Sequence, residues 1–394
     1  MIDVLVSGAG PAGSSVARRS AELGLSTTLL DRSAFPRDKC CAGGLLERAV
    51  RRIGVELPDS VIEKEIMGFA VMAGEHRREF RYDVRLGVTV KRRNLDAFLV
   101  EEARRAGVEV MEGVEARRAV EDGEGVSVET SSGTLRCKYL AIADGVNSRL
   151  GRGLFGPLKR GTVAAGLATD VLVKGDSGNL AEIELFDTPT RRIPWKSFPV
   201  NGWIFPHRDG ANLGVVGQRR SGPELRRFVD KLVSRLEERH GTVERLELRA
   251  HSLPFRYRGR LHTARSVILG DAAGLVNPLT GEGMGYAFAA SKVASECLAD
   301  ALCNDDPRML ASYDGGCERE FLKDFRAAML IGPVLHRLVG VVDTGHFISN
   351  MTDEEELVEA YSGMARGDSD WFDLARLTAP RFLPLFFSSL GRLD

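Results

Sequence analysis

The sequence predicts an α/β fold: a Rossmann-like nucleotide-binding domain that is interrupted by an antiparallel sheet domain and followed by a helical C-terminal part. Three observations support this. A strand, glycine turn, helix and second strand fit residues 1–31, the hydrophobic period changes to two between 161 and 261, and an apolar strand returns at 266–269. The expected units are a discontinuous nucleotide-binding domain at 1–160 and 262–325, a substrate-binding sheet domain at 161–261 and a helical region at 326–394.

The composition argues against several classes of function. The 54 basic and 55 acidic residues give a net charge of −1, so we expect no nucleic-acid partner. The six cysteines form no CxxC pair and the seven histidines are scattered, so we expect no metal site. No apolar run reaches about 18 residues, and the first residues resemble a strand rather than a signal peptide. We therefore expect a cytoplasmic protein with reduced thiols.

A glycine turn joins the first expected strand, Ile2–Ser7, to a helix over Ser14–Leu23. The turn consists of Gly8, Ala9, Gly10, Pro11, Ala12 and Gly13. A second strand, Ser26–Leu30, leads to Asp31. Residues without a Cβ let a diphosphate approach the first turn of the helix, and Asp31 can bond a ribose diol. The complete unit predicts dinucleotide binding, whereas a glycine turn of an unrelated α/β protein is the alternative.

A vicinal cysteine pair follows, Cys40 and Cys41, in a loop that continues with Ala42 and two glycines. Neighbouring Lys39 and Arg37 favour a thiolate at Cys41, and the small residues give access to it. The alternative is that both cysteines serve as small hydrophobic residues, and Cys40 competes with Cys41 as the working thiol.

A helix is expected to begin near Arg92, because apolar residues recur at 95, 98 and 99. Arg92 points either to an anionic ligand or, with its neighbour, to a solvated helix end. A later strand from Tyr139 ends in Asp144 and Gly145, and the following Ser148 and Arg149 have side chains that can reach phosphate or ribose.

In the sheet region, Trp203 and Phe205 are two residues apart, so both side chains are expected on one strand face next to Pro206. They predict an apolar wall over a hydrocarbon substrate, and ordinary strand packing is the alternative. An amphipathic helix at 221–240 is expected to be scaffold.

The strand at 266–269 runs into the segment Gly270–Gly285. Its Asp271 can accept hydrogen bonds from hydroxyl groups. Gly283 and Met284 are expected to begin a long helix, whose free N–H groups favour an electron-rich ligand. Further on, the apolar runs 327–335 and 383–390 predict either helix packing or a flap that contacts the inner membrane surface.

The glycine turn, the Asp-Gly strand and the late Gly-Asp segment, in this order, resemble the flavoprotein hydroxylase superfamily, whose fold is that of p-hydroxybenzoate hydroxylase. The resemblance implies FAD as cofactor and Arg92 in contact with the flavin nucleotide. It also implies that Ala116, after a strand at 108–111, uses its backbone against the adenine. The chain departs from the family pattern at Gly151, where an arginine is usual.

Two further stretches resemble the geranylgeranyl reductases, including the archaeal digeranylgeranylglycerophospholipid reductases. Residues 39–45 match Lys-x-Cys-Gly-Gly-Gly-Leu except at Ala42, and residues 201–206 match Tyr-x-Trp-x-Phe-Pro except at Asn201. The resemblance implies FAD-dependent reduction of isolated double bonds in geranylgeranyl chains of isoprenoid lipids or prenyl diphosphates. The hydride comes from N5 of the reduced flavin, and Cys41 positions the substrate or relays the proton. An external electron donor is implied, either NAD(P)H, a ferredoxin or a deazaflavin.

The expected site follows from these stretches. The FAD-binding residues are Gly8, Gly10, Ala12, Gly13, Asp31, Cys41, Ala42, Gly44, Arg92, Ala116, Asp271, Gly283 and Met284, and the substrate-binding residues are Trp203, Phe205 and Pro206. Two other functions fit the same fold: a flavin monooxygenase or halogenase, and a flavin electron carrier to a quinone.

Overall fold

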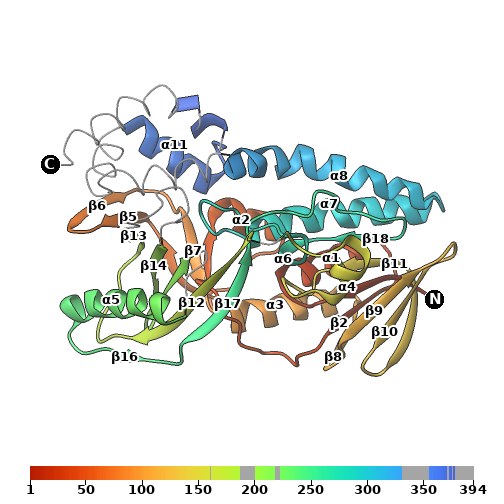
Figure 1. Ribbon diagram of the computed structural model, residues 1–394, viewed down its shortest axis with the longest axis horizontal. Helices are drawn as coiled ribbons and strands as arrows, with labels where there is room; N and C mark the ends of the chain where they lie inside the picture. The colour runs from red at the N-terminus through yellow and green to blue at the C-terminus, as the bar shows by residue number, and fades with distance from the viewer. Residues whose placement is uncertain are drawn as a thin grey trace.

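The computed structural model describes residues 1–159, 161–186, 200–217, 222–330, 355–370, 372–374 and 376–377. The nucleotide-binding sheet and the antiparallel sheet lie at opposite ends of an elongated molecule, and the helices that follow the last strand run along its upper side (Figure 1).

The first sheet has the strand order β8-β2-β1-β11-β10-β9, and β18 pairs with the other end of β11. Its centre is parallel, as a Rossmann-like unit requires, and only β10 pairs antiparallel with its two neighbours. The strands are β1 (Ile2–Ser7), β2 (Thr27–Asp31), β8 (Glu109–Glu112), β9 (Ala116–Glu121), β10 (Val126–Thr130), β11 (Gly133–Ile142) and β18 (Ser266–Ile268).

The strands of this sheet are buried because helices cover it. Val4, Leu5 and Val6 of β1 are fully buried. The covering helices are α1 (Pro11–Glu22), α3 (Arg92–Arg105) and α7 (Met284–Cys303), and α1 packs against both of the others. Helix α1 begins three residues earlier than predicted, because proline is favourable at the first helical position.

The second sheet has the order β16-β12-β15-β14-β13-β5-β6, with β17 beside β12. Its strands are β5 (Gly68–Ala73), β6 (His76–Arg81), β12 (Val163–Leu172), β13 (Leu180–Phe186), β14 (Val200–His207), β15 (Gly210–Gly217), β16 (Glu244–Arg245) and β17 (Arg249–Pro254). The predicted range 161–261 was therefore incomplete, because β5 and β6 belong to the same sheet. Their parallel pairing with β13 is not visible in the sequence.

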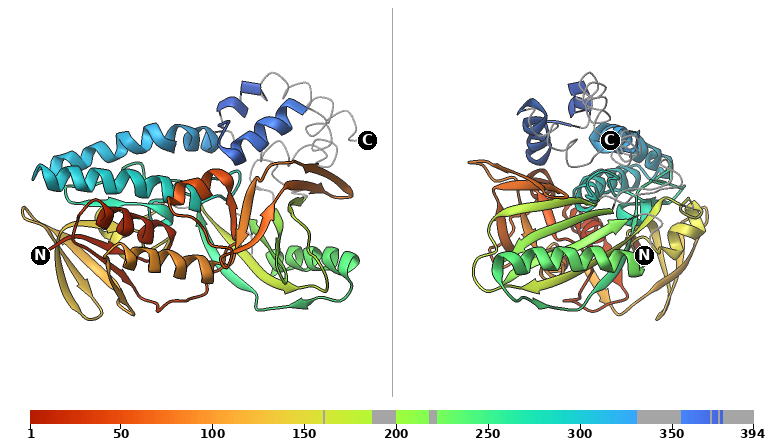
Figure 2. Two further views of the ribbon diagram at one scale, coloured as in Figure 1. Left: turned by 180° about the vertical axis from the view of Figure 1, so that it is seen from behind. Right: turned by 60° about the vertical axis from the view of Figure 1, so that its left-hand side comes forward.

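Helix α5 (Gly222–His240) covers the outer face of this sheet with one apolar stripe, as its periodicity predicted (Figure 2). The stripe consists of Leu225, Val229, Leu232 and Leu236, which are buried against the even-numbered residues of β14. The odd-numbered residues of β14 therefore face the other way, towards the nucleotide-binding domain.

A small third sheet connects the two domains: β3 (Gly44–Leu46), β7 (Gly87–Val90) and β4 (Ile62–Ile66), with α2 (Glu47–Ile53) after β3. A short helix, α4 (Arg149–Phe155), follows β11, and another, α6 (Gly270–Ala273), follows β18.

The C-terminal part is helical in the described residues. It contains η2 (Pro307–Ala311), α8 (Ser312–Cys317), a π-helical turn η3 (Glu318–Leu322), helical residues 323–330 and α11 (Glu355–Arg366). The predicted apolar run 327–335 is described only as far as 330, and 383–390 lies outside the described residues. Among the helices described, none has the length and apolar character needed to cross a membrane.

Candidate active site between the two sheets

The glycine turn is tightly packed at Gly13 and leaves free space at Gly10. A Cβ on Gly13 would lie 1.7 Å from the Gly8 carbonyl oxygen, so α1 can pack against β1 only with glycine there. A Cβ on Gly10 would meet nothing nearer than guanidinium nitrogens of Arg37 at 3.7 Å and Arg92 at 3.9 Å. The first turn of α1 therefore opens towards two cations, an arrangement that suits a diphosphate. Ala12 is buried and its carbonyl accepts a bond from Ser291.

Asp31 ends β2 beside the turn. Its Oδ2 accepts a 2.8 Å hydrogen bond from the Ala9 N–H and its Oδ1 accepts one from Ser33 N–H, so the carboxylate is fixed in orientation. The Val114 N–H bonds the Asp31 carbonyl, and two residues later Ala116 begins β9 in a buried position. The structure thus brings Asp31 and the backbone before Ala116 to the same end of the sheet.

Arg92 is the first residue of α3 and is only 6 % exposed, so the interpretation as a solvated helix end was wrong for this residue. Its Nε and Nη2 donate 2.7 Å hydrogen bonds to the two oxygens of buried Asp96. Burial alone would lower the pKa of Arg92, but the Asp96 charge raises it above its ordinary value. Arg37 Nη1 lies 3.0 Å from Asp96 Oδ2. We had not predicted Arg37 and Asp96 as site residues, although the i,i+4 Arg-Asp spacing is visible in the sequence.

Asp271 lies where three chain segments converge. Its Oδ2 is 3.5 Å from Lys39 Nζ of the cysteine loop and 3.6 Å from His251 Nε2 of β17. Burial would raise the pKa of Asp271, but the neighbouring Lys39 and His251 lower it below the ordinary value, so the group is ionised at neutral pH. A Cβ on Gly283 would lie 3.5 Å from Oδ1, so the carboxylate also borders the start of α7.

Helix α7 begins at Met284 with Gly283 as its N-cap and no side-chain cap, so its first N–H groups are not bonded by a capping side chain. The loop before it is fixed from within. Asn277 Oδ1 accepts the Leu279 N–H at 2.9 Å, and Glu282 pairs with Arg48 of α2 in a largely buried contact. Nothing in the local sequence identifies Arg48 as a site residue, because its partner Glu282 is 234 positions away in the chain.

The two cysteines of the loop have different surroundings. Cys40 donates to the Arg249 carbonyl at 3.4 Å, and burial raises the pKa of this thiol to about 11. It is therefore protonated at neutral pH and oriented towards β17. Cys41 lies against the Arg92 guanidinium instead. Both half-buried thiols line the same pocket, and Ala42 follows in a half-buried position.

The end of the cysteine loop contacts the predicted substrate strand. A Cβ on Gly44 would lie 2.6 Å from the Phe205 ring, so this ring rests directly on the loop backbone. A Cβ on Gly214 would lie 2.4 Å from the Trp203 indole, which is spread over the neighbouring strand. Trp203 Nε1 donates to Asn212 Oδ1 at 2.8 Å. Pro206 does not share this face: strand alternation places it on the α5 side, and its carbonyl accepts a bond from Thr89.

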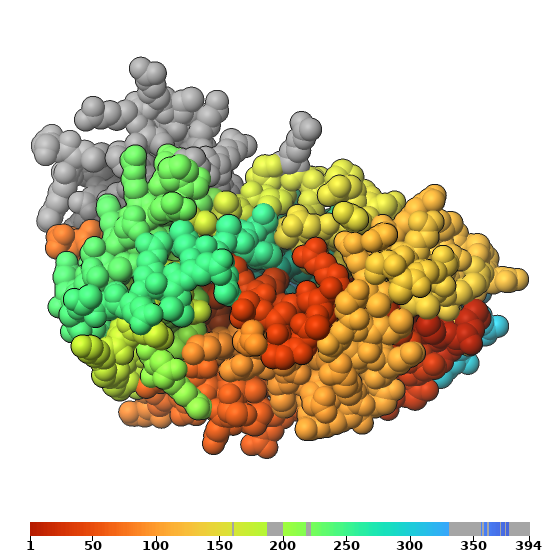
Figure 3. All heavy atoms as spheres, turned by 90° about the horizontal axis from the view of Figure 1, so that it is seen from below, coloured from red at the N-terminus to blue at the C-terminus, as the bar shows by residue number. Residues whose placement is uncertain are grey.

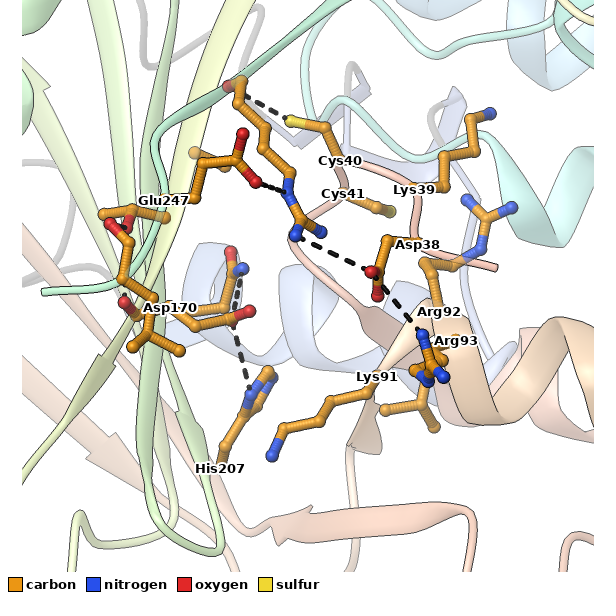
Figure 4. Close-up of a pocket in the computed structure, with 16 residues that line it drawn as sticks. Asp38, Lys39, Cys40, Cys41, Lys91, Arg92, Arg93, Asp170, His207 and Glu247 are labelled. Carbon is orange, nitrogen blue, oxygen red and sulfur yellow. Dashed lines mark hydrogen bonds and ion pairs between the residues drawn. The ribbon is translucent and has the colours of Figure 1, made fainter. Parts of the chain in front are cut away.

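A charged pocket opens where the cysteine loop meets β12, β15 and β17. The surface is hollowed between the loop, in red, and the segment around β17, in green (Figure 3). The pocket is lined by Asp38, Lys91, Arg93, Asp170, His207 and Arg249, with both cysteines at its upper edge (Figure 4). No group of three or more residues suited to hold a metal ion occurs among the described residues.

The Asp-Gly strand contributes a carboxylate with one buried oxygen and a helix cap. Asp144 Oδ1 is shielded from solvent without a hydrogen-bond partner among the described residues. Ser148 does not extend towards a ligand as expected, because its Oγ caps α4 by accepting the Gly151 N–H at 2.7 Å. A Cβ on Gly151 would lie 2.8 Å from the Ile268 side chain, so α4 packs closely on β18 at this residue.

The site has the features that FAD requires. A glycine turn faces two guanidinium groups, a fixed carboxylate stands at the end of β2, and a second carboxylate borders the start of α7. Flavin adenine dinucleotide offers a diphosphate, a ribose diol and ribityl hydroxyls to these three places. The buried Asp144 Oδ1, which has no partner among the described residues, is a further polar atom that a ligand can satisfy.

Comparison with known proteins supports this assignment. Residues 1–321 match the family described as FAD binding domain. Digeranylgeranylglycerophospholipid reductase 1 of Methanopyrus kandleri is 30% identical over 370 residues, which are 90% of this chain and 96% of that protein. Menaquinone reductase of Mycobacterium tuberculosis is 28% identical over 388 residues, covering 90% and 92% of the two chains.

Solved structures confirm the predicted fold of p-hydroxybenzoate hydroxylase type. A geranylgeranyl bacteriochlorophyll reductase-like protein from Thermoplasma acidophilum superposes with a TM-score of 0.79 at 19% identity, covering 98% of each chain. The flavin-dependent brominase Bmp2 reaches 0.72 at 19% identity, covering 97% and 99%. These likenesses concern the fold. With the family match and the archaeal relatives, they lead to one conclusion: the chain belongs to the FAD binding domain family and, within it, to the family of the digeranylgeranylglycerophospholipid reductases.

Proposed function

We propose that this protein is an FAD-dependent oxidoreductase that reduces isolated C=C bonds in the geranylgeranyl chains of isoprenoid lipids. The observation that carries the proposal is the substrate strand: Trp203 and Phe205 stand on the sheet face that meets the cysteine loop, and the Phe205 ring rests on Gly44. An apolar wall at this place suits a long hydrocarbon. The archaeal relatives carry the name of enzymes that act on such chains.

In this proposal the residues around the glycine turn hold FAD. Arg37 and Arg92 face its diphosphate beside Gly10, Asp31 bonds the adenosine ribose, and Asp271 bonds the ribityl chain. Gly283 and Met284 present the α7 N–H groups to the flavin ring, while the small Ala42 lets the cysteine loop approach it. When bound and reduced, FAD supplies the hydride.

The protein itself must orient the alkene and exclude water. Trp203 is fixed by a chain of hydrogen bonds, since Asn212 Nδ2 in turn donates to Asp170 Oδ1 at 2.9 Å. Cys41 of the cysteine loop, which lies against Arg92 of α3, positions the substrate against the cofactor. Reduction then takes place in an apolar environment where charges are poorly screened.

The relatives named menaquinone reductase favour a second substrate class, a quinone whose side chain is a prenyl chain or whose ring accepts the electrons. The same apolar wall suits both lipids. Monooxygenase and halogenase chemistry finds less support, because the likeness to halogenases is one of fold at identities under 25%.

The proposed partners of the protein are an external electron donor and the membrane surface that carries its lipid. An external donor, either NAD(P)H, a ferredoxin or a deazaflavin, reduces the flavin, because each reduction of a double bond consumes the two electrons that the flavin carries. The protein works in the cytoplasm and takes its lipid at the inner membrane surface. Sedimentation with lipid vesicles tests this contact.

The test of the proposed function is anaerobic. The purified protein is reduced with dithionite, a geranylgeranyl ether lipid or menaquinone is added, and flavin reoxidation is followed together with the product mass. Reoxidation with a mass gain of about two per turnover located in the prenyl chain supports the proposal, since one hydride and one proton are added. A mass gain in the quinone ring supports the second candidate. Flavin that stays reduced with both lipids contradicts both.

A further inference from the structure

An isolated prenyl double bond is not polarised, so its reduction needs a proton donor as well as a hydride. The ordinary pKa of a thiol is about 8.5 and that of an imidazolium about 6.5, so the imidazolium is the stronger acid by roughly a hundredfold. Around the site, Cys40 is a still weaker acid, because burial raises its pKa to about 11 and it points to the Arg249 carbonyl. A histidine on the substrate face is therefore the better candidate.

His251 stands on that face. The strand register shows this through its neighbour Arg249. Arg249 pairs with Ala168, Ala168 with Gly214, and Gly214 with Trp203. Directly paired residues point to the same side of a sheet, and His251 is two residues from Arg249 on β17. His251 and Trp203 therefore belong to one surface. They lie at its two ends, three strand spacings and two residues along the strand apart, which is about 16 Å.

The floor between these two side chains is formed by small residues. Gly166 is the direct neighbour of His251 on β12, and Ala168 and Gly214 lie between Arg249 and Trp203. The Leu253 side chain lies over Gly166 and the Trp203 indole lies over Gly214, so the surface between Trp203 and the imidazole is apolar and suits a hydrocarbon chain. Asp271 marks the other side of this space, because its Oδ2 lies 3.6 Å from His251 Nε2.

The His251 imidazole lies near the negatively charged Asp271 but makes no hydrogen bond to it. His251 Nε2 is buried and has no hydrogen-bond partner among the described residues, since 3.6 Å exceeds hydrogen-bond distance. The charged group beside it is Asp271 from α6, and Lys39 from the cysteine loop lies 3.5 Å from the same Asp271 oxygen. Asp271 thus fixes the place of the imidazole at the edge of the substrate face without taking up its Nε2.

We propose that His251 is the proton donor of the reduction, acting from the substrate face beside Asp271. This rests on the proposed function. One alkene carbon receives the hydride that the reduced flavin supplies, and the other receives the proton from Nε2, so two C–H bonds replace the π bond. The neutral imidazole regains its proton from water. The external donor named above returns the two electrons to the flavin.

The experiment compares His251→Gln with the wild-type holoenzyme in the anaerobic single-turnover assay with the geranylgeranyl ether lipid. We expect reoxidation about 10² to 10⁴ times slower in the variant, the usual contribution of a general acid. Glutamine keeps a polar group beside Asp271, so FAD affinity, measured by fluorescence titration of the stripped protein, should stay within about twofold of wild type. His262→Gln is the matched control, because His262 pairs with Asp314 at 2.7 Å, outside the site, and should react at the wild-type rate.

Two further readouts separate proton donation from a structural role. The wild-type and His251→Gln rates should differ in their dependence on pH, because only the wild type carries the imidazole. Free imidazole added to His251→Ala should restore part of the rate. A variant that reacts at the wild-type rate, or whose defect disappears with excess FAD, overturns the role of His251. A wild-type protein that fails to reduce any prenyl chain overturns the proposed function and, with it, this inference.

Discussion

At the scale of single residues, the site depends on charges that are paired in buried surroundings. Arg92 and Asp96 form two parallel hydrogen bonds at the start of α3, and Arg37 adds a third contact from the cysteine loop. Such a pair adds little net stability by itself, but removing one partner leaves a buried charge without compensation. The arrangement thus holds two guanidinium groups in front of the glycine turn.

Asp96→Ala should lower the free energy of unfolding by about 3 to 5 kcal/mol, because Arg92 would remain buried without its counter-ion. It should also weaken FAD binding, since Arg92 loses its fixed orientation. Urea unfolding and fluorescence titration with FAD measure the two effects. Arg93→Ala is the control: this neighbour is exposed and should change stability by no more than about 0.5 kcal/mol. Equal losses in the two variants would contradict the argument.

Asp144→Asn should stabilise the FAD-free protein at neutral pH. Burial raises the pKa of Asp144 from 3.8 to about 6, so the folded state holds a proton that the unfolded state has already released between these values. Its contribution to stability is therefore greatest at low pH and falls as pH rises from about 4 to about 6. Because the residue is partly exposed, we expect a gain of about 1 to 2 kcal/mol at pH 7, and none at pH 3.5. Urea unfolding across this range tests it, with exposed Asp83→Asn as control.

At the scale of elements, glycines set how closely segments approach. Gly13 lets α1 pack on β1, Gly8 takes a positive φ of 98° in the turn, and Gly44 lets the Phe205 ring rest on the cysteine loop. An added methyl group would meet different atoms at these positions. Alanine substitutions there therefore distinguish effects on folding from effects on ligand binding.

Gly10→Ala and Gly13→Ala should fail in different ways. Alanine at 13 collides with the Gly8 carbonyl, so we expect loss of stability and of the folded glycine turn. Alanine at 10 meets no protein atom within 3.7 Å and fits its backbone angles, so the fold should persist while FAD affinity falls, because the methyl group occupies the diphosphate space. Circular dichroism and FAD titration distinguish the two. Tight FAD binding by Gly10→Ala would contradict the assigned cofactor position.

Gly44→Ala should change lipid handling more than cofactor binding. The added methyl group would push the Phe205 ring from its place 2.6 Å away, which alters the apolar wall. We expect a higher KM for the geranylgeranyl lipid with FAD affinity changed by less than about threefold, since the contact is made to a side chain rather than to backbone. Steady-state kinetics with varied lipid measure this. An unchanged KM would separate Phe205 from the substrate site.

At the scale of the whole molecule, the site is assembled from three places. The cysteine loop, the antiparallel sheet and the late helix α7 meet at Asp271, which Lys39 and His251 approach from two sides. Bound FAD would contact segments from both domains and link them. Its binding energy is then part of the stability of the folded molecule.

Adding FAD at a hundred times its Kd should stabilise the folded state by about 2.7 kcal/mol, which corresponds to a rise of a few degrees in Tm. Differential scanning calorimetry of stripped and reconstituted protein measures it. Gly10→Ala, which should keep its fold, should show little rise at the same FAD concentration. An equal rise in this variant would place FAD elsewhere.

Much of the architecture follows from the sequence alone. The strand–turn–helix–strand unit, the two-residue period of the second sheet and the long helix after Gly283 were confirmed within a few residues, because each depends on local periodicity and on glycine or proline at turns. The FAD cofactor was confirmed by the family match. The assigned role of Cys41 stays a prediction.

Only the tertiary structure decided the rest, because it depends on contacts between distant segments. It added β5 and β6 to the second sheet, showed Arg92 buried on Asp96 rather than solvated, and turned Pro206 away from the substrate face. It also brought His251 to Asp271, although 20 positions separate them and no local pattern marks the histidine. Sequence periodicity determines which face a residue occupies, whereas domain packing determines what that face meets.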